Sequence, residues 1–188
     1  MIRRSLTIGL MLSCVIVLGS GKAEAGKIPL KGSFSGTFVN MQTDTNADGV
    51  KANLNSVGAK GTLGPSTIQG VNEYVSSGPA SCPNGNAGEG STLLRSSNPV
   101  APANFVQRFE STGDLLFYEE TSGTSCFDPD TSIEFFSTTT KIIGGTGRFE
   151  GATGTGEVSG TANDLFDDAA GNFFGAQSGT FTATITIP

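Results

Sequence analysis

Residues 141–160 read KIIGGTGRFEGATGTGEVSG, and the structure of this glycine-rich stretch decides the fold class. Its glycine spacing superficially matches a dinucleotide-binding loop, which requires a helix that opens on the last glycine of the motif. The residues after Gly151 are mostly glycines and β-branched side chains, and both are poor helix formers. The Gly-Lys-Ser/Thr ending of a P-loop is also missing. The stretch therefore predicts tight turns between strands and not a phosphate-binding loop.

The last residues of the chain give the clearest strand. In residues 178–188, SGTFTATITIP, threonines alternate with apolar side chains, which indicates a strand with one buried face. Similar, less regular segments occur at 31–40, 68–75, 104–110, 114–120 and 131–141. Turn residues separate them at short intervals, and no long amphipathic helix is visible. About eight to ten strands at this spacing are typical of a β-sandwich or a β-barrel.

Within such a β-structure, the opening stretch predicts two turns. We expect Ile142 and Ile143 to end one strand, GGTG to form the turn, and residues 148–152 to begin the next strand. Glycine accepts positive φ angles at no steric cost, which suits it to the turn. Gly154 and Gly156 fall inside the following strand, where glycine favours bulges and tight bends of the kind that curl a sheet into a barrel.

The segment IIGGTGRFEGATGTGEVSG resembles the glycine-rich segment of the allene oxide cyclase-like barrels, the superfamily that includes the plant dirigent proteins. Those proteins share a GGTGxF turn followed by small residues and further glycines. The matching positions are Gly144, Gly145, Thr146, Gly147, Phe149, Gly151, Ala152 and Gly154. The resemblance implies an all-β, single eight-stranded antiparallel β-barrel with an apolar lumen, often assembled as a trimer, here in an exported bacterial member. Enzymes of this superfamily cyclise or orient reactive apolar molecules inside the barrel.

The N-terminus has the features of a secretory signal peptide. Residues 1–25 combine a short basic start, an apolar run and a small-x-small site at Ala23-Glu24-Ala25, so we expect cleavage before Gly26. An alternative is a lipoprotein site at MLSC, with Cys14 lipidated. Residues 26–188 then form one β-barrel domain that is exported to the periplasm or secreted. No other stretch approaches the roughly 20 apolar residues of a membrane helix.

Charge and the missing residue types exclude several function classes. The chain has 11 basic and 17 acidic residues; Arg3, Arg4, Lys22 and Glu24 lie in the signal peptide, so 8 and 16 remain and the net charge is −8. Such acidity argues against a nucleic-acid partner and against anionic membrane surfaces. The chain has no His, which excludes Ser-His-Asp and Cys-His catalysis and any His-ligated metal.

Two cysteines, Cys82 and Cys126, remain after signal cleavage. An even number of cysteines in an exported chain predicts a disulfide, because the periplasm and the exterior are oxidising. The alternative is two free, buried thiols.

The residues DTNADG contain the most specific polar motif. Asp44, Asn46, Asp48 and Gly49 match the first half of a calcium-binding loop, in which alternate oxygens converge on the ion. The twelfth position, normally a bidentate Glu, is Asn55, so any calcium site would be weak. The alternative is an acidic turn whose side chains cap their own backbone. No other cofactor is expected.

The segments NFVQRFE and DLLFYEE flank STGD, which predicts a β-hairpin. Arg108, Glu110 and Tyr118 would form a small polar ligand-binding cluster if they all pointed into the apolar lumen. The alternative is a solvent-exposed salt bridge on the outer wall.

Three functions follow from these observations and remain open. The first is a module that binds a small apolar molecule in the lumen, the second an isomerase or dirigent-type enzyme acting on such a molecule, and the third a structural surface protein. A polar cluster in the lumen would favour the enzyme, an open and apolar lumen the binding module, and a filled lumen the structural protein.

Overall fold

The computed structural model describes residues 26–41, 50, 52–98, 101 and 103–188, most of which lie in β-strands. Nine strands and two short 3₁₀ helices follow one another along this part of the chain. They are β1 (Gly26–Asn40), β2 (Ala52–Gly61), β3 (Gly64–Ser81), β4 (Ala87–Leu93), η1 (Leu94–Ser96), β5 (Ala103–Phe109), β6 (Leu115–Asp128), β7 (Ile133–Gly145), η2 (Gly147–Phe149), β8 (Thr153–Asp167) and β9 (Phe173–Ile187). Among these residues, no helix is long and apolar enough to cross a membrane.

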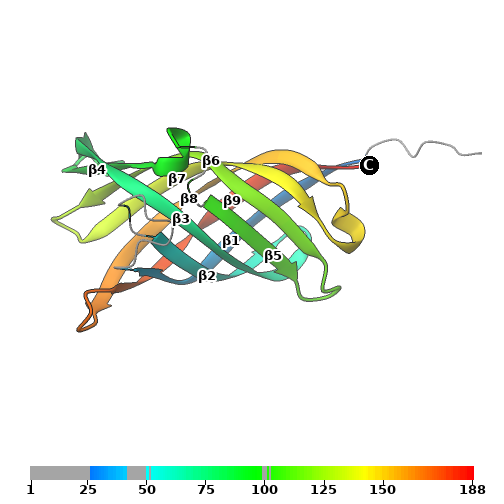
Figure 1. Ribbon diagram of the computed structural model, residues 1–188, viewed down its shortest axis with the longest axis horizontal. Coiled ribbons are helices and arrows are strands. Elements are labelled where there is room, and N and C mark those ends of the chain that lie inside the picture. Colours follow the sequence, from blue (N-terminus) through cyan, green and yellow to red (C-terminus); the bar gives the residue numbers. More distant parts are fainter. Residues whose placement is uncertain (1–25, 42–49, 51, 99–100, 102) are drawn as a thin grey trace, which may run out of the picture.

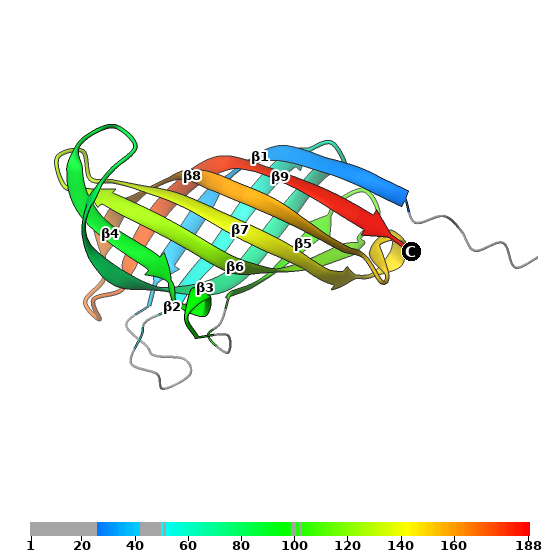
Figure 2. The same cartoon turned by 90° about the horizontal axis from the view of Figure 1, so that it is seen from above.

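The strands form one closed antiparallel sheet (Figure 1, Figure 2). β1 pairs with β2 and β9, the order continues through β8 and β7 to β6, and β2 pairs with β3. Both β4 and β5 lie between β3 and β6, with β4 along one end of these two strands and β5 along the other. The nine strands therefore fill eight positions of the ring, and the predicted eight-stranded antiparallel barrel is confirmed.

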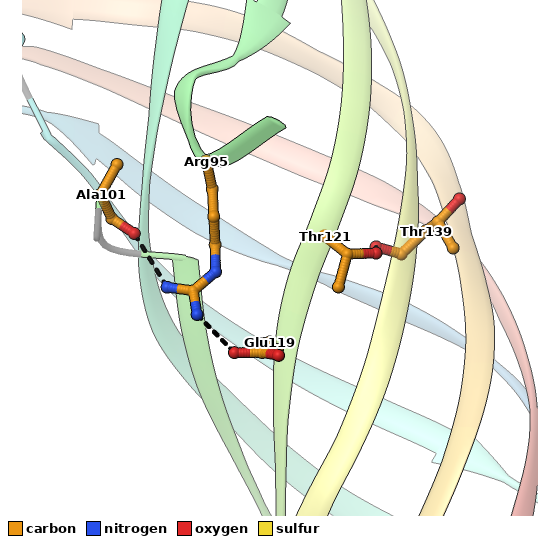
Figure 3. A network of polar contacts seen from close by, with 5 residues as sticks. All are labelled: Arg95, Ala101, Glu119, Thr121 and Thr139. Atoms are coloured by element: carbon orange, nitrogen blue, oxygen red, sulfur yellow. Dashed lines mark hydrogen bonds and ion pairs between the residues drawn. The ribbon is translucent and has the colours of Figure 1, made fainter. Parts of the chain in front are cut away.

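The connection between β4 and β5 is held on the outer wall by Arg95 of η1 (Figure 3). Its guanidinium donates a hydrogen bond to the backbone carbonyl of Ala101 at 3.0 Å and pairs with the Glu119 carboxylate of β6 at 2.5 Å. Both charged side chains are mostly covered, at 20% and 17% exposure, so solvent screens this pair less than a fully exposed one. The ion pair thus anchors the connection to β6 at the point where β4 ends and β5 takes over its place in the barrel wall.

The inner wall combines phenylalanines with glycines on neighbouring strands. A Cβ atom at any of the glycines would collide with the ring beside it. The pairs are Phe34 with Gly179, Phe38 with Gly175, Phe105 with Gly70, Phe136 with Gly160 and Phe181 with Gly32. Because glycine has no side chain, each ring can lie against the wall of the barrel, where it covers backbone that would otherwise be bare.

The GGTG turn differs from the prediction in two respects. β7 does not end at Ile142 and Ile143 but continues to Gly145. Residues 148–152 do not begin a strand, because Gly147–Phe149 forms η2 and β8 starts at Thr153. Phe149 has no exposed surface, and its ring centroid lies 5.0 Å from that of Phe109 in the core. Gly147 has a φ of 58°, which permits the sharp turn. Burial of the aromatic ring outweighs strand extension here, and the motif plugs this end of the barrel, which we call the closed end.

The opposite end carries the β3–β4, β6–β7 and β8–β9 hairpins, and we call it the open end (Figure 1). A disulfide links Cys82, just after β3, to Cys126 of β6, with Cα atoms 5.4 Å apart. The predicted pairing of the two cysteines is therefore present. Close by, the Asp128 carboxylate accepts hydrogen bonds from the side chains of Asn84, Asn86 and Thr131 and from the Asp130 amide. These bonds, led by that of Asn84, hold the pKa of Asp128 well below its usual range.

Candidate functional site

A cavity of about 410 Å³ occupies the barrel lumen. Its inner part, toward the closed end, is lined by apolar residues such as Leu30, Ile68 and Phe181. Its outer part reaches the surface at the open end, where Phe127 and Phe173 line it and are each 36% exposed. A volume of this size is typical of a small-molecule site. Among the described residues, the lumen is therefore neither filled by side chains nor closed off from solvent.

Five polar side chains from five strands meet across this lumen, and we call them the lumen polar cluster. They are Gln177 of β9, Asn55 of β2, Asn72 of β3, Glu120 of β6 and Thr138 of β7. The Gln177 amide donates to the Asn55 oxygen at 2.9 Å, Asn55 donates to the Asn72 oxygen at 3.3 Å, and Asn72 donates to Glu120 at 2.8 Å. Thr138 donates to the other Glu120 oxygen at 3.2 Å. The chain of donors thus runs in one direction and ends on the carboxyl of Glu120.

Glu120 is the chemical centre of the cluster. Only 6% of its surface is exposed, and it lines the cavity. Burial raises its pKa to about 7, although the hydrogen bonds from Asn72 and Thr138 oppose this by stabilising the charged form. None of the described residues that line the cavity is a Lys or an Arg, so no cation neutralises the carboxylate there. Glu120 can therefore gain or lose a proton near neutral pH.

Two tyrosines lie beside this carboxyl on the cavity wall. Burial, reinforced by the charge of Glu120, raises the pKa of Tyr74 and Tyr118 far above the usual value, so both phenols stay protonated. Tyr118 stacks on Phe105, with ring centroids 5.5 Å apart. Two neutral hydroxyl groups are consequently available to donate hydrogen bonds inside an otherwise aromatic wall.

Further carboxyls lie toward the open end of the cavity. Glu134 of β7 and Asp164 of β8 both line it, and burial raises the pKa of each; the charge of Asp164 adds to this effect at Glu134. The Ser125 hydroxyl faces Glu134 and opposes the effect of burial, but its geometry falls short of a hydrogen bond. Ser125 is only 8% exposed and its oxygen has no hydrogen-bond partner among the described residues. The mouth of the lumen is thus acidic and holds an unsatisfied hydroxyl.

The structure does not bring the three predicted ligand-binding residues together. Tyr118 lines the cavity, whereas Arg108 and Glu110 are exposed on the outside. The reason is the hairpin register: Arg108 pairs with Leu115 and Phe105 pairs with Tyr118. Directly opposed residues point to the same face of a sheet, so Tyr118 shares its face with Phe105 and not with Arg108.

The same register identifies the residues that the sequence interpretation missed. Gln107 and Glu120 point inward from β5 and β6, and Gln107 donates to the Ser66 hydroxyl at 2.8 Å. The available signal was the length of the STGD turn, which sets the pairing and hence the shared face. Gln177 gave no such signal, because it lies 122 residues from Asn55 along the chain. Asn55 and Asn72 lie on consecutive strands, but β2 was not among the strands expected from the sequence.

The predicted calcium ligands Asp44, Asn46 and Asp48 lie outside the described residues. Within the described part of the chain, no three His, Cys, Asp or Glu side chains gather in a way that could hold a metal ion.

The sequence matches no protein-family model and no curated protein. Among solved structures, the chain is similar to the pterocarpan synthase dirigent protein GePTS1, with 13% sequence identity and a TM-score of 0.44, over 89% of this chain and 88% of that one. Likeness at this level says nothing about activity.

Proposed function

We propose that the lumen binds a small, largely apolar molecule that carries one hydrogen-bonding group. The observation that carries this proposal is Glu120, a buried carboxyl at the centre of an open cavity whose inner half is mostly apolar. Apolar ligand surface would replace water against the inner wall, and the polar group would lie against Glu120 and the tyrosine hydroxyls. A buried carboxyl without an ion-pair partner costs stability, which is typical of functional sites.

A second candidate function is proton-transfer catalysis of the isomerase type. The elevated pKa of Glu120 favours it, because a general acid–base group works best when its pKa lies near the operating pH. Glu120 would take a proton from one atom of a bound substrate and return it to another, while Tyr74 or Tyr118 donates a hydrogen bond to the oxygen that gains charge. The structural role, which requires a filled lumen, has the least support.

A neutral fluorescent probe, N-phenyl-1-naphthylamine, tests binding in the lumen. We expect saturable fluorescence enhancement with the natural chain and its loss in Ala183→Phe, which fills the cavity from β9. Thr184→Phe is the matched control, because Thr184 is exposed on the opposite face of the same strand. Equal binding by both variants would place the probe outside the lumen and refute the proposal.

Export and self-association are part of the same proposal. A disulfide is stable in an oxidising compartment, which supports export to the periplasm or beyond. The outer face carries exposed apolar side chains, among them Leu54 at 42% and Ile143 at 49%, which suit contact with a second copy of this chain. Light scattering of the mature protein, compared with Leu54→Lys and Ile143→Lys, tests this association; a natural chain that is already monomeric would contradict it.

A further inference from the structure

Among the described residues that line the lumen, the charged side chains are all carboxyl groups. Glu120, Glu134 and Asp164 place three carboxyl groups along the cavity from its centre to its mouth, and the described lining residues contribute no Lys or Arg. The phenol groups of Tyr74 and Tyr118, which also line the cavity, stay neutral and supply no positive charge either. Any molecule that enters the lumen therefore meets a field of one sign, in a setting that screens charge less than water does.

A second feature is a buried hydroxyl that a ligand could pair with. The Ser125 oxygen is buried, lines the cavity beside Glu134, and has no partner within the described structure. Buried polar atoms are seldom left unpaired, because each lost hydrogen bond costs free energy. An ammonium group could donate to its oxygen, and the hydroxyl proton could then be directed to Glu134.

The aromatic side chains of the cavity wall also favour a cation. Phe38, Phe136, Tyr74 and Tyr118 all line the cavity, and ring faces carry partial negative charge that attracts organic cations. The chain of hydrogen bonds also favours a cation beside Glu120. Its donors run from Gln177 through Asn55 and Asn72 to Glu120, and so they stabilise that carboxyl in its negatively charged form.

We propose that the ligand of the lumen is an organic cation: an aromatic or aliphatic amine whose ammonium group lies between Glu120 and the carboxyls at the mouth, with its apolar part toward the closed end. This inference rests on the proposed binding in the lumen and specifies the class of ligand. An organic cation fits better than a metal ion, because the described residues include no cluster of three metal-ligating side chains and the inner half of the cavity is mostly apolar.

Protonation of Glu120 must then be coupled to binding. An ammonium group beside this carboxyl stabilises its charged form, so binding lowers its pKa from about 7 and releases a proton at pH below that value. The affinity for an amine should therefore rise with pH up to about 7 and level off above it. The titratable groups that share its cavity are Tyr74, Tyr118, Glu134, Glu157 and Asp164, and the tyrosines stay neutral throughout this range.

Three indole compounds of similar size test whether the lumen prefers a cationic, a neutral or an anionic ligand. Tryptamine is a cation, indole-3-ethanol is neutral and indole-3-propionate is an anion. Their affinities for the mature protein are measured by isothermal titration calorimetry at pH 6 and pH 8. We expect tryptamine to bind about tenfold more tightly than the alcohol or better, the propionate to bind least, and only tryptamine to gain affinity between pH 6 and pH 8.

Glu120→Gln should weaken tryptamine by about tenfold or more, abolish its pH dependence and leave the alcohol unchanged. Glu110→Gln, which removes an exposed carboxyl outside the lumen, is the matched control and should change neither. If the alcohol or the propionate binds as tightly as tryptamine, the cation inference is overturned while binding in the lumen stands. If none of the three binds while N-phenyl-1-naphthylamine does, the cation inference is overturned and binding in the lumen stands. If the probe does not bind either, the proposed function fails together with the cation inference.

Discussion

Replacing Glu120 by Gln should stabilise the barrel above neutral pH. The carboxyl is 6% exposed and has no cationic partner among the residues that line the cavity, so its ionisation in the folded chain is unfavourable. Gln has nearly the same shape but carries no charge. Its amide oxygen can accept the hydrogen bond from Asn72, and its amide nitrogen can donate to the Thr138 hydroxyl.

The magnitude follows from the two pKa values of Glu120. Its pKa is 4.5 in a model peptide and about 7 in the folded barrel. At about 1.4 kcal/mol for each pH unit, this difference corresponds to roughly 3 kcal/mol. Below pH 4.5 the carboxyl is protonated in both folded and unfolded chains and the stabilising contribution is fully present. Between pH 4.5 and 7 the unfolded chain ionises while the folded chain does not, so the free energy of unfolding of the natural protein falls.

The assay is urea unfolding followed by circular dichroism, at closely spaced pH values from 4 to 9. The difference in unfolding free energy between Glu120→Gln and the natural chain should grow by roughly 3 kcal/mol from pH 4 to pH 8, then stay constant. Glu110→Gln serves as the control, because its side chain is exposed, and its curve should run parallel to that of the natural chain. A pH-independent difference for Glu120→Gln would refute the conclusion that burial without a cationic partner raises the pKa of this carboxyl.

Three other variants test the closed end of the barrel, the disulfide and the stability at acidic pH. Phe149→Ala should lower the free energy of unfolding by about 3–5 kcal/mol in the same urea assay, because it removes a fully buried ring from the plug; a loss below about 1 kcal/mol would show that η2 does not close the barrel. Cys82→Ser with Cys126→Ser should cost about 4 kcal/mol, since the disulfide closes a loop with a sequence separation of 44; an unchanged urea midpoint under reducing and oxidising conditions would contradict this. Asp128→Asn should flatten the loss of stability below about pH 4, because the pKa of Asp128 is lowered in the fold and its contribution, present above the unfolded pKa, disappears as the pH falls; acid unfolding curves that coincide would refute it.

The alternation of side chains could be predicted because it is local. In β9 the sequence places Phe181 and Ile185 on one face and threonines on the other, and both apolar residues are buried as expected. The disulfide was predictable for an equally simple reason, since only one pairing of Cys82 and Cys126 exists. The GGTG turn was predictable too, but the course of residues 148–152 was not, because it depends on a core contact between Phe149 and Phe109.

The candidate site shows the limit of this local information. Sequence periodicity assigns Arg108 and Tyr118 each to a face of its own strand, but which faces coincide depends on the pairing of the two strands. A register change of one residue would exchange the inner and outer faces of a strand. The structure pairs Arg108 with Leu115, which places Arg108 outside and Glu120 inside.

The sequence by itself thus determined most of the strands, although not β2 and β4, together with the turn glycines and the disulfide, because these depend on near neighbours or on composition. Only the tertiary structure decided that β4 and β5 share one position of the ring and that the lumen holds a carboxyl at the end of a directed chain of donors. Gln177 and Asn55 are 122 residues apart, and they meet only because β1 pairs with both β9 and β2 in the closed ring. Closure of the sheet depends on pairings between strands that are distant in the sequence. The burial of Glu120 without a cationic partner depends on the same closure.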